Sequence, residues 1–105
     1  MLEARQQQWK SILQITEQLH QLSADESWQA VTELESERLG QLQKFFSTAV
    51  DKTEVNEIEE GIREMLKSDE LLMQLITSQQ QNISDVVKKI STGKKAIKAY
   101  GIFQK

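Results

Sequence analysis

Apolar side chains recur at helical spacing along three segments of the chain. In the longest pattern, core-facing positions follow one another at steps of three and four residues, from Val55 to Ile90, without a change of phase. These positions are Val55, Ile58, Ile62, Met65, Asp69, Leu72, Ile76, Gln79, Ile83, Val86 and Ile90. Such spacing marks one face of a helix, and it predicts a single long helix over about residues 54–91, about 55 Å in length.

Two shorter helices are predicted upstream of the long one. Residues 3–22 carry an apolar stripe at helical spacing. The stripe consists of Trp9, Ile12, Leu13, Ile15, Leu19 and Leu22. The Ser-x-x-Glu spacing of Ser23 and Glu26 is typical of a capping box, so a second helix is predicted over residues 24–47. Residues 47–53 lose the periodicity and are predicted to form a loop.

Charged and polar residues interrupt the predicted apolar faces at a few positions. Glu35 and Arg38 stand at core-facing spacing in the second helix and can form an ion pair with each other. Two interpretations are open: a salt bridge at the rim of the core, or a charge kept for a binding partner. On the long helix, Asp69 and Gln79 either fix the register and the choice of partner or mark where the apolar face turns toward water.

A break in the long helix is the alternative to a continuous one. Residues 67–70, Lys-Ser-Asp-Glu, include side chains that commonly cap helices. A new helix after a loop would resume the same phase only by coincidence, and Leu72 and Ile76 continue the phase of the preceding residues. The pattern therefore favours one helix.

The end of the chain differs in charge from the rest. All sixteen acidic residues lie within residues 1–85, whereas residues 86–105 carry six lysines and no acid. Gly93 is predicted to end the long helix, because glycine is the preferred residue directly after a helix. Residues 94–105 then form a mobile basic tail, which can make a turn or two of amphipathic helix but must dock to be stable. Its candidate regulatory residues are Lys94, Lys95, Ile97, Lys98, Tyr100, Ile102 and Phe103.

Composition is consistent with one small helical domain over residues 1–105. The chain has no proline and no cysteine, and 28% of its residues are charged and 38% hydrophobic. The predicted fold is all-α: an antiparallel bundle of three main helices, the third much longer, plus a short C-terminal helical tail. No apolar stretch approaches the roughly 18 residues of a membrane span, and the first residues are too polar for a signal peptide. A cytoplasmic location is predicted.

The helix lengths predict a surface for a partner. The first two helices are each about 30 Å long and can cover only the first half of the third. The uncovered half carries the candidate partner-binding residues Leu72, Ile76, Gln79, Ile83, Val86, Val87 and Ile90. Leaving its aliphatic side chains in water would forgo about 1.5 to 3 kcal/mol each, so a cover is expected. Three covers are open: the folded-back tail, a second copy of the chain in a homodimer, or a helix of another protein.

Several short stretches share a pattern with a known family. They are Trp28, the run Glu37-Arg38-Leu39 with Leu42 and Phe45-Phe46, residues 69–76, and the run Lys95-Ala96-Ile97-Lys98-Ala99-Tyr100-Gly101. Together they resemble the flagellar export chaperones of the FliT type, and the resemblance spans nearly the whole chain. The Tyr-Gly pair after a lysine-rich turn and the arginine in the second helix are its more specific parts.

The resemblance implies a cytoplasmic, all-helical chaperone. Such a protein holds the filament-cap protein before that protein passes through the type III export apparatus. The resemblance further implies contact with the export ATPase and, in some members, with the master activator of flagellar gene transcription. In that family the C-terminal helix is held to restrain partner binding, which gives the basic tail its candidate regulatory role.

Other classes of function find little support in the sequence. The only histidine, His20, lies among glutamines, and no glycine-rich phosphate loop is present, so neither an enzyme nor a cofactor is predicted. No inward cluster of metal-ligating residues is predicted either. Six lysines beside an acidic body predict neither direct nucleic-acid binding nor stable membrane association. The main alternative is a structural coiled coil or adaptor that self-associates through the long helix.

Overall fold

Four α-helices account for most of the described chain. The computed structural model describes residues 2–78 and 84–103. Its elements are α1 (Glu3–Ala24), α2 (Trp28–Phe45), a 3₁₀ turn (Lys52–Glu54), α3 (Val55–Ser78) and α4 (Ser84–Phe103). No strand occurs in these residues, and the predicted all-α class is confirmed. Among the helices described, none combines the length and the apolar character that a membrane crossing requires.

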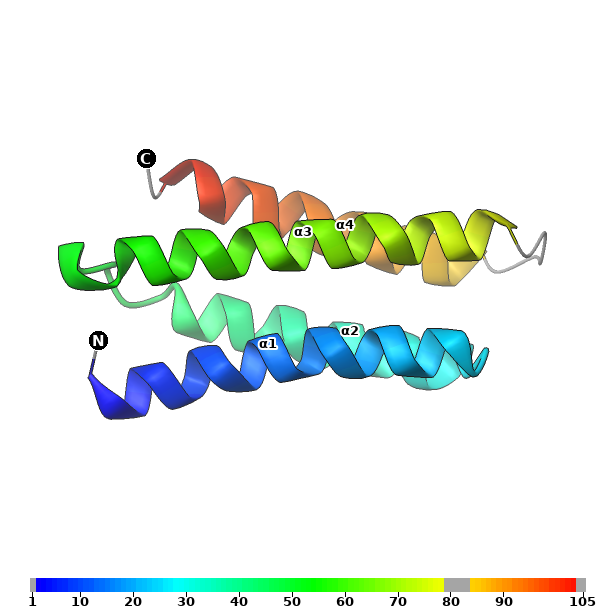
Figure 1. The fold of residues 1–105 in the computed structure, drawn as a ribbon, viewed down its shortest axis with the longest axis horizontal. Coiled ribbons are helices and arrows are strands. Elements are labelled where there is room, and N and C mark those ends of the chain that lie inside the picture. Colours follow the sequence, from blue (N-terminus) through cyan, green and yellow to red (C-terminus); the bar gives the residue numbers. More distant parts are fainter. Residues whose placement is uncertain (1, 79–83, 104–105) are drawn as a thin grey trace.

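The helices form two hairpins that stack on each other (Figure 1). One hairpin consists of α1 and α2, and the other of α3 and α4. Across the stack α1 lies beside α3 and α2 lies beside α4, and the helices of each such pair run in the same direction. Within the described residues the backbone of α1 stays away from that of α4, and the backbone of α2 from that of α3, so these pairs lie diagonally and meet only through side chains in the interior. Helix α4 therefore packs on a surface made by α2 and α3.

The start of α2 differs from the prediction. Instead of capping α2, Ser23 lies inside α1, where its hydroxyl donates a hydrogen bond of 2.7 Å to the carbonyl of Leu19. The chain then reverses, with Glu26 at a φ of 58°, and α2 begins at Trp28. The predicted capping box is wrong because Ser23 is buried and its hydroxyl is satisfied within its own helix.

The predicted helix over residues 54–91 is two helices. Helix α3 passes through residues 67–70 without a break, as predicted, but it ends at Ser78, and α4 begins at Ser84. The spacing of the buried residues does not change across the junction. Ile76 and Val86 are ten residues apart, which equals two steps of three residues and one of four. Periodicity identifies the buried face only, so it does not distinguish one straight helix from two helices joined in phase.

The return of the chain buries the residues that a straight helix would leave in water. Val86, Ile90 and Ile97 are each at most 5% exposed and pack with residues of α2 and α3. Each burial contributes about 1.5 to 3 kcal/mol, which favours the reversal. The expected bare strip on an overhanging helix is therefore wrong, and the alternative of a coiled coil that self-associates through this strip loses its premise.

Gly93 does not end a helix. Helix α4 continues through it to Phe103, so residues 94–103 are the second half of α4 and not a separate tail. The physical reason is packing, because Gly93 is buried at a close contact with α2. A glycine inside a helix costs about 1 kcal/mol relative to alanine, which tight packing can offset.

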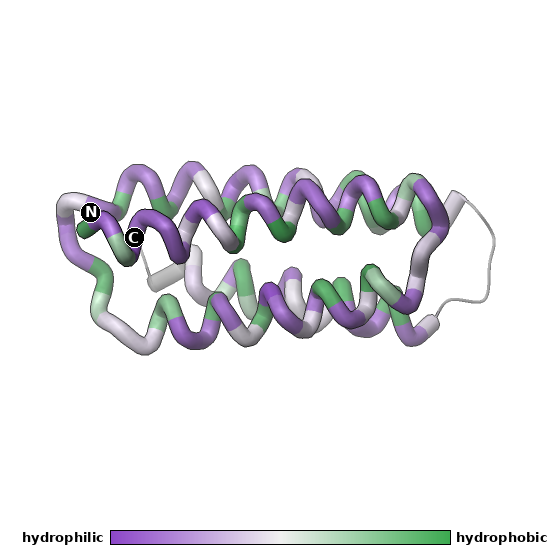
Figure 2. Tube along the Cα trace, turned by 90° about the horizontal axis from the view of Figure 1, so that it is seen from below, coloured by the Kyte–Doolittle hydropathy of each residue, from purple (hydrophilic) through white to green (hydrophobic). Residues whose placement is uncertain are grey.

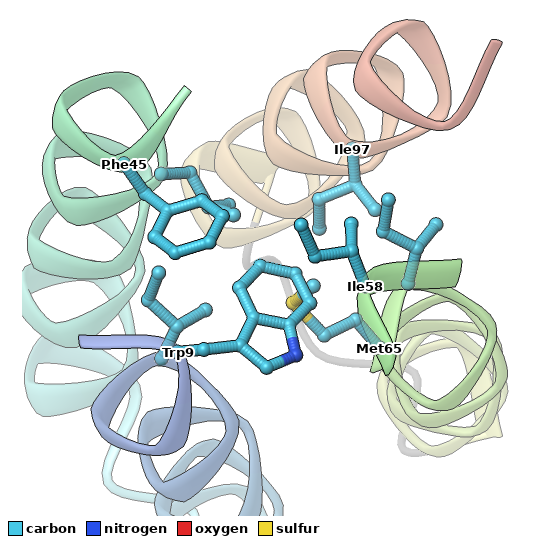
Figure 3. Close-up of a cluster of buried hydrophobic side chains, with 8 residues drawn as sticks. Trp9, Phe45, Ile58, Met65 and Ile97 are labelled. Carbon is cyan, nitrogen blue, oxygen red and sulfur yellow. The ribbon is translucent and has the colours of Figure 1, made fainter. Parts of the chain in front are cut away.

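Two apolar clusters fill the interior, one toward each end of the bundle. The first apolar cluster consists of Trp9, Ile12, Leu42, Phe45, Ile58, Ile62, Met65 and Ile97 (Figure 3). The second apolar cluster consists of Ile15, Leu19, Val31, Leu72, Ile76, Val86 and Ile90. Every helix contributes to both clusters, and Figure 2 shows apolar residues recurring between polar ones along each helix.

Close packing in the first apolar cluster depends on a second helical glycine. A Cβ at Gly61 of α3 would lie 2.6 Å from Cζ2 of Trp9. The Trp9 ring in turn packs against Phe45, with ring centroids 4.9 Å apart. Glycine at position 61 therefore allows the indole to lie directly on the backbone of α3.

Candidate functional site

A buried layer of polar side chains separates the two apolar clusters. This polar layer consists of Thr16 from α1, Glu35 and Arg38 from α2, and Asp69 from α3. Each of these residues is at most 6% exposed. Helix α4 meets the layer at the backbone of Gly93. All four helices therefore converge on one charged site near the middle of the bundle.

Arg38 holds the polar layer together. Its Nη1 donates a hydrogen bond of 3.1 Å to Oγ1 of Thr16, and its Nη2 donates to Oε2 of Glu35 at 2.6 Å and to Oδ2 of Asp69 at 2.9 Å. The predicted pairing of Glu35 with Arg38 is confirmed. Of the two interpretations left open, a salt bridge at the rim is wrong, because both side chains are at most 1% exposed. One guanidinium thus links α1, α2 and α3.

The polar layer holds two carboxyl groups for one guanidinium. Burial raises the pKa of Glu35 to about 7; the positive charge of Arg38 opposes this shift without cancelling it, and the nearby Asp69 adds to it. Burial also raises the pKa of Asp69, again against the effect of Arg38. The layer therefore favours the protonated form of both carboxyl groups more than water does.

Arg38 itself stays charged in this environment. Burial would lower its pKa, but the adjacent carboxylates of Asp69 and Glu35 outweigh burial and raise it. A buried, permanently charged group needs partners, and the two terminal nitrogens of Arg38 find them on three helices, whereas its Nε has none among the described protein atoms. The layer therefore disfavours any packing of the helices that separates Arg38 from these partners.

Glu35 faces the backbone of α4 at Gly93. Its Oε1 has no hydrogen-bond partner among the described protein atoms. A Cβ added at Gly93 would clash with Oε1, because the two atoms would be less than 3.0 Å apart and real Cβ atoms essentially never come so close to a neighbour. The same Cβ would lie 3.8 Å from Nη2 of Arg38. Glycine at this position therefore lets α4 approach the charged site.

Further contacts fasten α4 along its length. Lys94 forms an ion pair with Glu70 of α3. Near the end of the helix the Tyr100 ring stacks on Phe46, with ring centroids 4.4 Å apart and planes 11° apart. In the first apolar cluster, Ile97 points from α4 toward α3 (Figure 3).

We use the term α4 groove for the surface of α2, α3 and the loop between them on which α4 lies. The groove residues in contact with α4, or buried with it in the second apolar cluster, are Glu35, Phe46, Ile62, Glu70, Leu72 and Ile76. The outward face of α4 is basic, because Lys88, Lys95 and Lys98 are exposed. The apolar face of α4 fills the groove, and these three lysines face solvent.

The residues predicted to bind a partner do not form an exposed strip. Leu72, Ile76, Val86 and Ile90 are at most 5% exposed in the second apolar cluster, and Val87 is partly buried against it. The two residues of α3 belong to the α4 groove, whereas the three from α4 belong to the helix that covers it. The predicted set therefore falls on the two sides of one internal interface, and its role in binding a partner stays a prediction.

Two other predicted residues of this set, Gln79 and Ile83, lie outside the described residues.

The residues predicted as a regulatory tail lie in the second half of α4. Ile97 is buried, Lys94 and Tyr100 are partly buried, and Lys95 and Lys98 are exposed. Ile102 and Phe103 lie in the last turn of α4, and their side chains are outside the described part.

Sequence reasoning missed two contributors to the charged site. Thr16 and Gly93 both stand at core-facing spacing, since Thr16 is four residues after Ile12 and Gly93 is three residues after Ile90. Each predicted helix carries a polar or small residue at a core-facing position. This shared feature is the sequence signal for a polar layer across the bundle. Which of these residues meet could come only from the arrangement of the helices.

A known family model matches nearly the whole chain. The model of a family described as flagellar protein FliT matches residues 6–102. This range includes the polar layer, the α4 groove and nearly all of α4. Neither a curated protein nor a solved structure shows significant similarity to the chain.

Proposed function

The chain belongs to the FliT family of flagellar chaperones, and on this premise we propose that it holds the flagellar filament-cap protein and escorts it to the type III export apparatus. The observation that carries the proposal is the family match over residues 6–102. The work would take place in the cytoplasm, before export. The proposed mechanism is that a client helix takes the place of α4 in the α4 groove.

The α4 groove supports binding of an amphipathic helix. A segment of the cap protein with one apolar face would be unfolded alone and would aggregate with its own copies. In the proposed complex this segment replaces α4 and buries its apolar face on groove residues such as Leu72 and Ile76. Helix α4 is then a cover that the client displaces.

The cover sets a threshold for binding. Releasing α4 exposes Val86, Ile90 and Ile97, which costs about 5 to 9 kcal/mol in apolar burial. A client must therefore offer a comparable apolar face, and its observed affinity is reduced by the fraction of time that α4 occupies the groove. A helix with only a few weak contacts does not displace the cover.

Released α4 provides a second binding surface. Its exposed Lys88, Lys95 and Lys98 and its freed apolar face are features that a further partner could bind. We extend the proposal to the export ATPase and to the master activator of flagellar gene transcription as partners of this second surface. Their binding would then depend on whether a client is in the groove.

The proposal is tested with the purified filament-cap protein of the same organism. Sedimentation velocity of the chain alone gives its oligomeric state, monomer or homodimer, and the mixture is expected to give a complex with a Kd of about 1 µM. The cap protein should stay unassembled in this complex. Absence of a complex at 100-fold higher concentrations, with the chain folded by circular dichroism, would refute the proposed client.

A further inference from the structure

We propose that the α4 groove selects helices by residue size at one position, so that a client helix able to replace α4 carries glycine opposite Glu35. The inference rests on the proposed function in one respect, namely that a client takes the place of α4. It adds a rule for which helices are accepted. The rule follows from the contact between Glu35 and Gly93.

The carboxyl group of Glu35 is held in place from behind. Its Oε2 is bound at 2.6 Å by Arg38, and Arg38 is fixed in turn by Thr16 and Asp69. The carboxyl group can turn away from α4 only by breaking its bond to a buried guanidinium. Because losing this bond leaves a buried carboxyl group without its cation, Glu35 makes room for a bulky side chain only at a cost in stability.

The other carboxyl oxygen points at the incoming helix. Glu35 Oε1 is buried, has no hydrogen-bond partner among the described protein atoms, and lies against the Cα of Gly93. A side chain at this position of a client would occupy the space of the oxygen. The groove therefore rejects helices by a built-in steric and charged obstacle, in addition to accepting them by apolar contact.

The remaining contacts of α4 extend the rule to a pattern. Relative to the central glycine, α4 has aliphatic residues seven and three positions before it, Val86 and Ile90, and four positions after it, Ile97. The residue directly after the glycine is Lys94, which pairs with Glu70. A client helix is expected to show the same order: aliphatic, aliphatic, glycine, cation, aliphatic.

The test uses synthetic α4 peptides and the full chain. A fluorescent peptide of residues 84–103 is titrated with the full chain carrying Gly93→Leu, whose own α4 can no longer seat at Glu35. Three peptides are compared by fluorescence anisotropy: the natural one, one with Gly93→Leu, and a control with Ala99→Leu. Ala99 is exposed on α4, so the control adds the same side chain away from the groove.

The natural and control peptides are expected to bind equally, and the Gly93→Leu peptide at least 100-fold more weakly. Adding Glu35→Ala to the chain should remove the obstacle, so that the Gly93→Leu peptide binds at least tenfold more tightly than it does to the chain with Glu35. Binding of the Gly93→Leu peptide within threefold of the natural one would overturn the rule. So would a lack of binding by all three peptides.

A milder variant covers the case in which the Gly93→Leu chain does not fold. In the full chain with Gly93→Ala, amide hydrogen exchange in α4 should become at least tenfold faster while exchange in α1 stays unchanged. Unchanged exchange in α4 would contradict the rule. No flagellar protein enters these experiments, so the selection rule and the identity of the client can fail independently.

Discussion

Replacing Arg38 by methionine should destabilise the fold severely, because it leaves two buried carboxyl groups without their cation. Arg38 is fully buried and makes hydrogen bonds of 3.1, 2.6 and 2.9 Å to three helices. Removing one partner of a buried ion pair typically costs about 3 to 5 kcal/mol. Against a total stability of about 5 to 15 kcal/mol, this loss is a large fraction.

The loss should depend on pH in a defined direction. At pH 8 the unfolded chain keeps Glu35 and Asp69 ionised, and folding of the variant must either bury their charges without a cation or protonate them, so the full loss of about 3 to 5 kcal/mol is expected. At pH 5 both carboxyl groups can take up a proton in the variant, and the loss should fall to less than half. The reason is that a neutral buried carboxyl costs less than a charged one.

Urea unfolding followed by tryptophan fluorescence measures this difference. With an m value of about 1.5 kcal/mol/M, the midpoint of the Arg38→Met variant should lie about 2 to 3 M below that of the parent at pH 8. The matched variant replaces the whole group by apolar residues, Glu35→Met, Arg38→Met and Asp69→Leu. It should be about as stable as the parent or more stable. A loss below about 1 kcal/mol for Arg38→Met at pH 8 would refute the reasoning.

Two further predictions concern single residues. The pKa of Glu35 is raised from 4.5 to about 7 in the fold, so its contribution to stability is present below pH 4.5 and lost as pH rises through 7. Thermal unfolding should show that the free energy of unfolding falls by about 3 kcal/mol over this pH range, and Glu35→Gln should abolish this fall. Gly61→Ala should cost about 1 to 3 kcal/mol because its Cβ meets Trp9, whereas Gly40→Ala, with nothing within 4 Å, should stabilise by up to about 1 kcal/mol in urea unfolding.

Much of the helical content could be predicted from residue spacing. The stripes of α1 and α3 and the absence of a break at residues 67–70 are local properties, and the buried face repeats every three or four residues. The pairing of Glu35 with Arg38 is equally local, because residues three apart in a helix are neighbours. These features need no knowledge of how the helices pack.

The reversal between α3 and α4 could not be read from spacing. Apolar residues keep one phase from Ile76 to Val86, and neither glycine nor proline interrupts residues 79–83. What decides between a straight and a folded path is the gain from burying Val86, Ile90 and Ile97 against α2 and α3. That gain is a tertiary term, absent from any local pattern.

The charged site, too, could be predicted from the sequence only in part. The sequence marks Glu35, Arg38 and Asp69 as polar residues at core-facing positions. It predicts a glycine stop at Gly93 because glycine commonly follows a helix, whereas the close approach of α4 to Glu35 is the actual reason for this glycine. Local preference and tertiary packing use the same residue, and only the fold separates the two causes.

Hydrogen exchange on the unmodified chain, with and without the filament-cap protein, tests most directly whether α4 is a cover that a client displaces. The account predicts that client binding speeds amide exchange in residues 84–103 and slows it, or leaves it unchanged, in α2 and α3. Slower or unchanged exchange throughout α4 in a formed complex would contradict it.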